Sequence, residues 1–138
     1  VSQGGYMKNI VIMAVAVVVI IGGLVWAGIN GRSKSETAAL TFATVSENVA
    51  HGAKLYDVRT LDEYNAGHFS GAINFPLQDI QAGKLPDVAK DTQIYVYCHS
   101  GNRSGQSATL LKQAGYTHVV DLHGLSSVES MGGSLTTS

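Results

Sequence analysis

One cysteine and the six residues after it are the part of this sequence best suited to chemistry. Cys98 is the only cysteine in the 138-residue chain. A lone cysteine forms no internal disulfide, and it lacks the second thiol of a Cys-x-x-Cys redox site or of most structural zinc sites. Its thiol is therefore either inert packing or a nucleophile, and its surroundings decide between the two.

The segments on both sides of Cys98 favour a reactive thiol. Residues 93–97 (QIYVY) are β-branched and aromatic and predict a strand, while residues 103–114 (RSGQSATLLKQA) have one apolar face and predict a helix. A loop between such elements lies at the carboxyl ends of the strands, where open α/β sheets bind ligands. Its amides and the positive end of the helix favour an anion, so we expect a thiolate at Cys98 and a site able to hold a persulfide.

The rest of the second half of the chain predicts an α/β fold. Short apolar runs alternate with helix-like stretches, which is typical of a parallel sheet, here of about five short strands, flanked by helices. Thr60 and Glu63 have the spacing of a capping box, with Gly67 as the C-cap. We expect strands at 55–58, 72–75, 93–97 and 119–122, and helices at 44–51, 60–67, 77–83 and 103–114.

Together these motifs resemble the rhodanese family. Residues 98–104 have the form Cys-x-x-Gly-x-Arg-Ser, which is similar to the active-site loop of that family. Four upstream segments also resemble the family in order and spacing: LYDVR at 55–59, EY at 63–64, GH at 67–68 and GAINFP at 71–76. The resemblance extends over about residues 44–124. A cysteine and an arginine alone would be weak evidence, whereas the ordered set is strong.

The resemblance implies a sulfurtransferase whose nucleophile is Cys98. A small anionic donor such as thiosulfate would leave sulfane sulfur on Cys98 as a persulfide, and a thiol, cyanide or a protein would accept it. Asp57 and Arg59 match the Asp-x-Arg of the family and are expected to support the loop. No metal or organic cofactor is implied. The donor-binding residues are expected to be His99, Ser100, Gly101, Asn102, Arg103 and Ser104.

Two positions depart from the family pattern. His99 stands where many members carry arginine, so the charge available for thiosulfate is weaker and depends on pH. After the last predicted strand, the usual Gly-Gly and a later tryptophan are replaced by HGLS at 123–126. His68, within a turn motif, is interpreted as a structural hydrogen-bonding residue.

Two other functions compete with sulfur transfer. A phosphatase or arsenate reductase also surrounds an oxyanion with a cysteine and an arginine, but that loop is one residue longer than the one joining Cys98 to Arg103. A catalytically silent interaction module usually lacks the cysteine. Cys98, His118 and His123 fit no common zinc spacing.

The first third of the chain predicts a membrane anchor. Residues 10–29 form an uncharged apolar run close to the ~20 residues that cross a bilayer as a helix. Lys8 precedes the run, Arg32 and Lys34 follow it, and a cleaved signal peptide is the competing interpretation. The predicted organisation is an N-terminal tail at 1–9, the anchor at 10–29, a linker at 30–42, the rhodanese-like domain at 43–128 and a flexible tail at 129–138.

These features predict a single-pass protein of the cell membrane, with the bacterial inner membrane as the expected location. The flanking charges differ by one and leave the side of the domain open, including an exported form. The formal net charge of -1 and only nine lysine and arginine residues give no basic field for phosphate backbones, which argues against nucleic acid as a partner.

Overall fold

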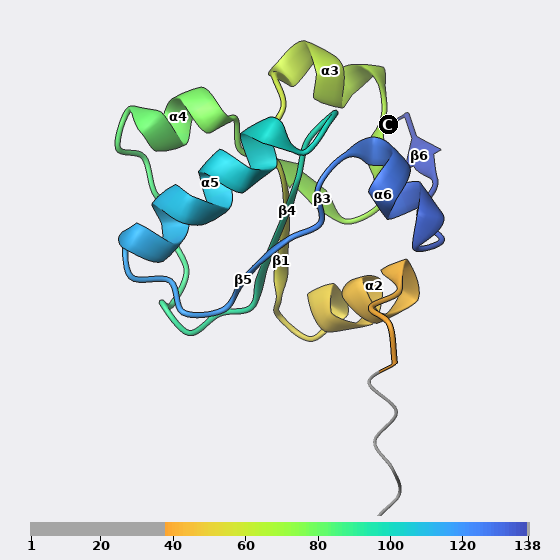
Figure 1. The fold of residues 1–138 in the computed structure, drawn as a ribbon, viewed down its shortest axis with the longest axis horizontal. Coiled ribbons are helices and arrows are strands. Elements are labelled where there is room, and N and C mark those ends of the chain that lie inside the picture. The colour runs from red at the N-terminus through yellow and green to blue at the C-terminus, as the bar shows by residue number, and fades with distance from the viewer. Residues whose placement is uncertain (1–37, 138) are drawn as a thin grey trace, which may run out of the picture. The chain divides into compact units, whose positions relative to one another are not determined.

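The computed structural model describes residues 38–137, which form helices and strands in the α/β pattern that the sequence predicts (Figure 1). The elements along the chain are α2 (Phe42–Ala50), β1 (Lys54–Asp57), α3 (Leu61–Ala66), β2 (His68–Phe69), β3 (Ala72–Asn74), α4 (Leu77–Gln81), β4 (Ile94–Tyr97), α5 (Asn102–Gln113), β5 (Val119–Asp121), α6 (Leu125–Ser130) and β6 (Leu135–Thr136).

The main sheet has four parallel strands in the order β3-β1-β4-β5. This corrects the expected number of about five. The short strand β2 does not join the main sheet, because it pairs antiparallel with β6, with His68 opposite Thr136 and Phe69 opposite Leu135. β1 and β4 are the central pair, and the loop that begins with Cys98 leaves the sheet from the end of β4.

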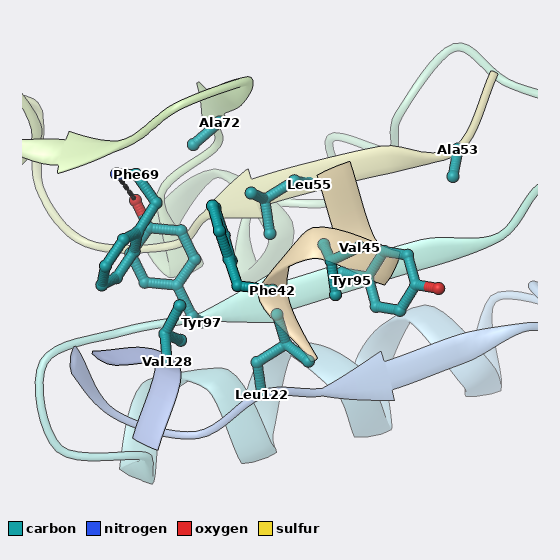
Figure 2. Close-up of a cluster of buried hydrophobic side chains, with 10 residues drawn as sticks. All are labelled: Phe42, Val45, Ala53, Leu55, Phe69, Ala72, Tyr95, Tyr97, Leu122 and Val128. Atoms are coloured by element: carbon teal, nitrogen blue, oxygen red, sulfur yellow. Dashed lines mark hydrogen bonds between the residues drawn. The ribbon is translucent and has the colours of Figure 1, made fainter. Parts of the chain in front are cut away.

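Each face of the sheet carries its own hydrophobic core, because successive strand residues point to opposite sides. Helices α4 and α5 lie over one face and α2 and α6 over the other (Figure 1). The core under α2 and α6, shown in Figure 2, consists of Phe42, Val45, Ala53, Leu55, Phe69, Ala72, Tyr95, Tyr97, Leu122 and Val128. The core under α4 and α5 consists of Tyr56, Val58, Ile80, Ile94, Val96, Cys98, Ala108, Leu111, Tyr116 and Val119.

Helix α3 confirms the predicted capping box. The backbone N–H of Glu63 donates to Thr60 Oγ1 at 3.3 Å, and the N–H of Thr60 donates back to Glu63 Oε2 at 3.0 Å. The helix is only six residues long, so these reciprocal bonds satisfy a large share of its unpaired donors. Gly67 caps its other end, as expected.

Both predicted domain boundaries need correction. Phe42, assigned to the linker, is buried in the core, and its N–H donates to Met131 O at 2.8 Å. Residues 129–137, assigned to a flexible tail, hold the end of α6 and strand β6. Gly133 is buried there against Val128 and Phe69. Sequence composition suggested a tail because the segment is rich in serine and glycine, whereas backbone pairing with β2 orders it.

The predicted anchor at 10–29 lies outside the described residues. None of the helices within residues 38–137 has the length and apolar character needed to span a bilayer.

Candidate active site

The position of Cys98 follows from the alternation of β4. Tyr97, the last residue of the strand, packs in the core under α2 and α6. Cys98 comes next and packs on the opposite face with Ala108 and Leu111 of α5. Its sulfur therefore lies beneath the start of α5, where helix N–H groups and the positive end of the helix dipole favour negative charge.

One amide, one hydroxyl and one left-handed turn define the surroundings of the sulfur. The N–H of Gly101 donates to Cys98 Sγ at 2.9 Å, and the thiol donates to Ser104 Oγ at 3.5 Å. Gly101 has φ of 97°, a left-handed conformation that turns the loop back over the sulfur and suits glycine. The Gly101 amide thus faces Sγ, and an anion cradle formed by the loop amides stays a prediction.

The charge state of Cys98 results from two opposed effects. The residue has no exposed surface, and burial by itself raises the pKa of its thiol. Hydrogen bonds from the Ser104 hydroxyl and from the amides of Ser104, Gly101 and Ser100 outweigh that effect, so the pKa of Cys98 is lowered. The residue also packs against apolar groups, so it is the hydrogen-bond donors near Sγ that favour the thiolate.

The loop is held from behind by the segment after β5. The N–H of Cys98 donates to His123 O at 2.9 Å, and the N–H of Leu125 donates to His99 O at 3.1 Å. Ser100 and Gly124 form an isolated antiparallel bridge. A Cβ on Gly124 would lie 2.7 Å from His99 O, so only glycine allows this approach. The sequence pointed to this segment only as a departure from the family, and long-range pairing gives it a function.

Arg103 lies at the start of α5 and binds Glu63 of α3. Its Nη1 donates to Oε2 at 2.6 Å and its Nη2 to Oε1 at 2.8 Å, a bidentate pair with both side chains partly exposed. This pairing lowers the pKa of Glu63 to about 2, the hydrogen bonds from Arg103 being the largest cause. Sequence reasoning placed Glu63 in the capping box and missed its second role, which depends on the approach of α3 to α5.

Asp57 and Arg59 form a buried network at the carboxyl end of β1. Arg59 Nε donates to Asp57 Oδ1 at 2.9 Å, and Tyr97 Oη donates to Asp57 Oδ2 at 2.8 Å. Arg59 Nη2 also donates to Gly67 O at 2.6 Å. Asp57 and Tyr97 are register partners on β1 and β4, so they share one face of the sheet. The network links β1, β4 and the turn at Gly67, and its Tyr97 packs on the face of the sheet opposite to Cys98. Tyr97 was not singled out by sequence.

The predicted donor-binding residues divide into two groups. Three of them have exposed side chains or surfaces and face solvent at the mouth of the loop: His99, Ser100 and Asn102. Ser104 is fully buried behind the sulfur, with Gly101 and Arg103 intermediate. His68 is buried, its Nδ1 lies 3.0 Å from Tyr64 O, and its ring stacks on Tyr64, which suits the predicted structural role.

A parallel sheet covered on both faces, with a cysteine loop joining β4 to α5, defines a rhodanese-like α/β domain. Residues 41–125 match the model of the Rhodanese-like domain family, which covers more than half of the chain. The chain therefore belongs to the rhodanese-like family.

Individual relatives agree with this assignment. The chain is 40% identical over 75 residues to the thiosulfate sulfurtransferase PspE of Escherichia coli, a match that covers 52% of this chain and 70% of that protein. It is also 40% identical over 70 residues to the adenylyltransferase and sulfurtransferase uba4 of Ogataea parapolymorpha, covering 51% of this chain but only 18% of that protein.

A solved structure extends the similarity to the fold. A rhodanese from Escherichia coli, solved with anions, superposes with a TM-score of 0.52 at 34% identity, covering 62% of this chain and 99% of that one. Together, the family match and these relatives support a rhodanese-like sulfurtransferase enzyme.

Proposed function

We propose that this protein transfers sulfane sulfur from thiosulfate or a related donor to a thiol or cyanide through a persulfide on Cys98. The observation that carries the proposal is the environment of one atom. Cys98 Sγ accepts the N–H of Gly101 at the start of α5, and its pKa is lowered although the residue is buried. A thiolate is the form of cysteine that attacks sulfur.

In the loading step, Cys98 Sγ attacks the outer sulfur of thiosulfate. A bond forms between Sγ and that sulfur, the S–S bond of the donor breaks, and sulfite leaves with the bonding electron pair. The products are Cys98–S–S⁻ and SO₃²⁻, and the total charge of −3 is unchanged from thiolate plus thiosulfate. We expect the loop amides near Sγ, Gly101 first, to stabilise the terminal sulfur of the persulfide.

In the unloading step, the acceptor attacks the terminal sulfur. A thiolate or cyanide forms the new bond, the bond to Sγ breaks, and Cys98 leaves as a thiolate. The products are a low-molecular persulfide or thiocyanate and the free enzyme, which restores the starting state. No proton has to move in either step when donor and acceptor are both anions.

The test is an intact-mass measurement on the full chain. Incubation with thiosulfate should add about 32 Da to the wild type, the mass of one sulfur on a nucleophilic cysteine, and add nothing to Cys98→Ser. Addition of cyanide should remove the adduct and release one equivalent of thiocyanate. A wild-type protein that gains no mass from thiosulfate or from a low-molecular persulfide would instead be the silent interaction module.

Access to the sulfur restricts the size of the reactants. Cys98 has no exposed surface, so a donor has to enter by a local movement of the loop at the exposed residues His99 and Ser100. Small donors and small alkylating reagents should therefore react faster than bulky ones. Equal rates for a small and a bulky maleimide, which share one reacting group, would contradict this closed arrangement.

A protein acceptor is a second destination for the sulfur. The similarity to the uba4 sulfurtransferase, in which the matching segment is a small part of a longer chain, supports this possibility. Transfer of labelled sulfur from the loaded protein to a candidate partner, measured against transfer to free thiols, tests it directly.

We also propose attachment to a membrane through residues 10–29, on the basis of their uncharged apolar sequence. The full chain should remain with the membrane fraction after alkaline carbonate extraction. Recovery in the supernatant, or an N-terminus that begins after residue 27, would replace the anchor with a cleaved signal.

A further inference from the structure

Three acceptor atoms lie near the Ser104 hydroxyl, which has a single proton to donate. Its oxygen lies 3.1 Å from Gly101 O, 3.3 Å from His123 O and 3.5 Å from Cys98 Sγ. A serine hydroxyl carries one proton, so it can donate to only one of these three atoms at a time. Ser104 is completely buried, so water does not compete for that proton.

The charge on Sγ determines which acceptor receives the proton. When Cys98 is a thiol, its S–H donates to Ser104 Oγ, and the hydroxyl is free to donate to a carbonyl. When Cys98 is a thiolate, a charged acceptor forms the stronger hydrogen bond, so the hydroxyl turns to Sγ. In the persulfide, the negative charge has moved to the outer sulfur and Sγ is a neutral disulfide sulfur. The hydroxyl then returns to Gly101 O or His123 O.

We propose that Ser104 is a catalytic residue that stabilises Cys98 as the leaving group when the acceptor removes the sulfur. This inference rests on the proposed persulfide function. The hydroxyl binds the free thiolate and releases the persulfide, so it favours unloading over storage. Among the groups that lower the pKa of Cys98, the Ser104 side chain has the largest effect, which agrees with this geometry.

The two half-reactions should respond in opposite directions to loss of the hydroxyl. A less stabilised thiolate is a better nucleophile and a poorer leaving group, with nucleophilicity changing about threefold per unit of thiol pKa. At a pH where every thiol is ionised, Ser104→Ala should therefore load sulfur at least as fast as wild type. It should release sulfur to cyanide several-fold more slowly, and persulfide should accumulate in the steady state.

Helix α5 itself offers a matched control. Ser107 lies one turn further along, is also fully buried, and its hydroxyl has no hydrogen-bond partner among the described residues. Ser107→Ala removes the same atoms from the same helix without touching the sulfur. It should leave loading and unloading rates equal to those of wild type.

The experiment measures each half-reaction separately on the full chain at pH 10. Wild type, Ser104→Ala and Ser107→Ala are loaded with thiosulfate, freed of donor, and mixed with cyanide while persulfide mass and thiocyanate are followed. We expect unloading of Ser104→Ala to be slower by about threefold or more, and the midpoint of its pH profile for alkylation to move upward by about one unit. Ser104→Thr, which keeps the hydroxyl, should follow wild type.

Each outcome has a defined meaning. Unloading of folded Ser104→Ala at the rate of Ser107→Ala would overturn the inference, and so would slow unloading by a folded Ser104→Thr. Should the alanine variant not fold, Ser104→Gly, which also lacks the hydroxyl, takes its place and should unload sulfur as slowly as predicted for the alanine variant. A wild type that never gains sulfur would overturn the proposed function itself, which the mass spectrum distinguishes from a failure of the role of Ser104 alone.

Discussion

Arg103 at the start of α5 and Glu63 in α3 bind each other through two hydrogen bonds, at 2.6 and 2.8 Å. The only arginine of the cysteine loop is therefore not a free cation. Its positive charge is shared with a carboxylate, and the pair fixes the position of the guanidinium beside the loop.

This pairing predicts a dependence between two substitutions. Arg103→Ala should raise the KM for thiosulfate by about tenfold, because it removes a cation and leaves the carboxylate of Glu63 unpaired near an anionic donor. The double variant Arg103→Ala with Glu63→Gln should recover part of that loss, because the repulsion is gone. Steady-state kinetics of wild type, Arg103→Ala, Glu63→Gln and the double variant give the coupling. Unchanged kinetics in Arg103→Ala would remove Arg103 from donor binding.

The lowered pKa of Glu63 predicts how the stability of the fold changes in acid. Its pKa is about 2 in the folded protein and 4.5 in the reference state, so the folded state binds its proton less readily than the unfolded chain. The stabilisation is present above about pH 4.5 and is lost as pH falls towards 2. Glu63→Gln should cost about 1 kcal/mol at pH 7, since the pair is partly exposed, and nothing at pH 2. Urea denaturation at several pH values measures this, and a difference that grows in acid would contradict it.

The buried network at Asp57 predicts different effects for two tyrosines. Tyr97→Phe removes the hydroxyl that donates to Asp57 and accepts the N–H of Phe69, leaving both groups buried without that partner. We expect a loss of about 1–3 kcal/mol in the free energy of unfolding. Tyr95→Phe is the matched control, because its hydroxyl accepts a hydrogen bond from Asn48, which is partly exposed. Equal losses in urea denaturation would show that the network has no special role.

Gly124 predicts a steric effect on the loop. An added Cβ would lie 2.7 Å from His99 O and 3.1 Å from Ser100 Cα, so Gly124→Ala has to displace the backbone that surrounds the sulfur. Activity should fall by about tenfold or more, since small displacements of catalytic groups have effects of that size.

Gly105 in α5 is the control for this substitution. A Cβ there would meet Asp121 Oδ2 at 3.5 Å, an ordinary contact. Gly105→Ala should therefore keep activity and stabilise the protein by about 0.5–1 kcal/mol through helix propensity. Equal activities in Gly124→Ala and Gly105→Ala would show that the close packing at Gly124 is not needed to hold the loop in its active position.

Local patterns of sequence were sufficient for most of the elements near the site. The alternation in QIYVY predicted β4, the spacing of Thr60 and Glu63 predicted the capped helix α3, and the loop sequence with the helix after it located Cys98. These features are set by interactions among residues close in the chain, which short patterns record directly.

Contacts between distant segments were not accessible in this way. The serine- and glycine-rich C-terminal sequence predicts a flexible tail, whereas in the structure its strand β6 pairs with β2. Local spacing predicts that Glu63 completes a capping box, but it does not predict that Glu63 also binds Arg103, forty residues later. Such pairings depend on where the whole chain places its elements, and no local propensity encodes them.

The sequence by itself determined the cysteine that we propose as the nucleophile, the loop that holds it and the α/β class, because each rests on residue types at fixed local spacing. Only the tertiary structure decided what surrounds the sulfur. Cys98 is fully buried, and the hydroxyl of its neighbour Ser104 has one proton for three acceptors. The carbonyl of His123, which follows β5, accepts the N–H of Cys98. The reactivity of a thiol depends on its burial and on the directions of nearby donors, and both are properties of packing in three dimensions.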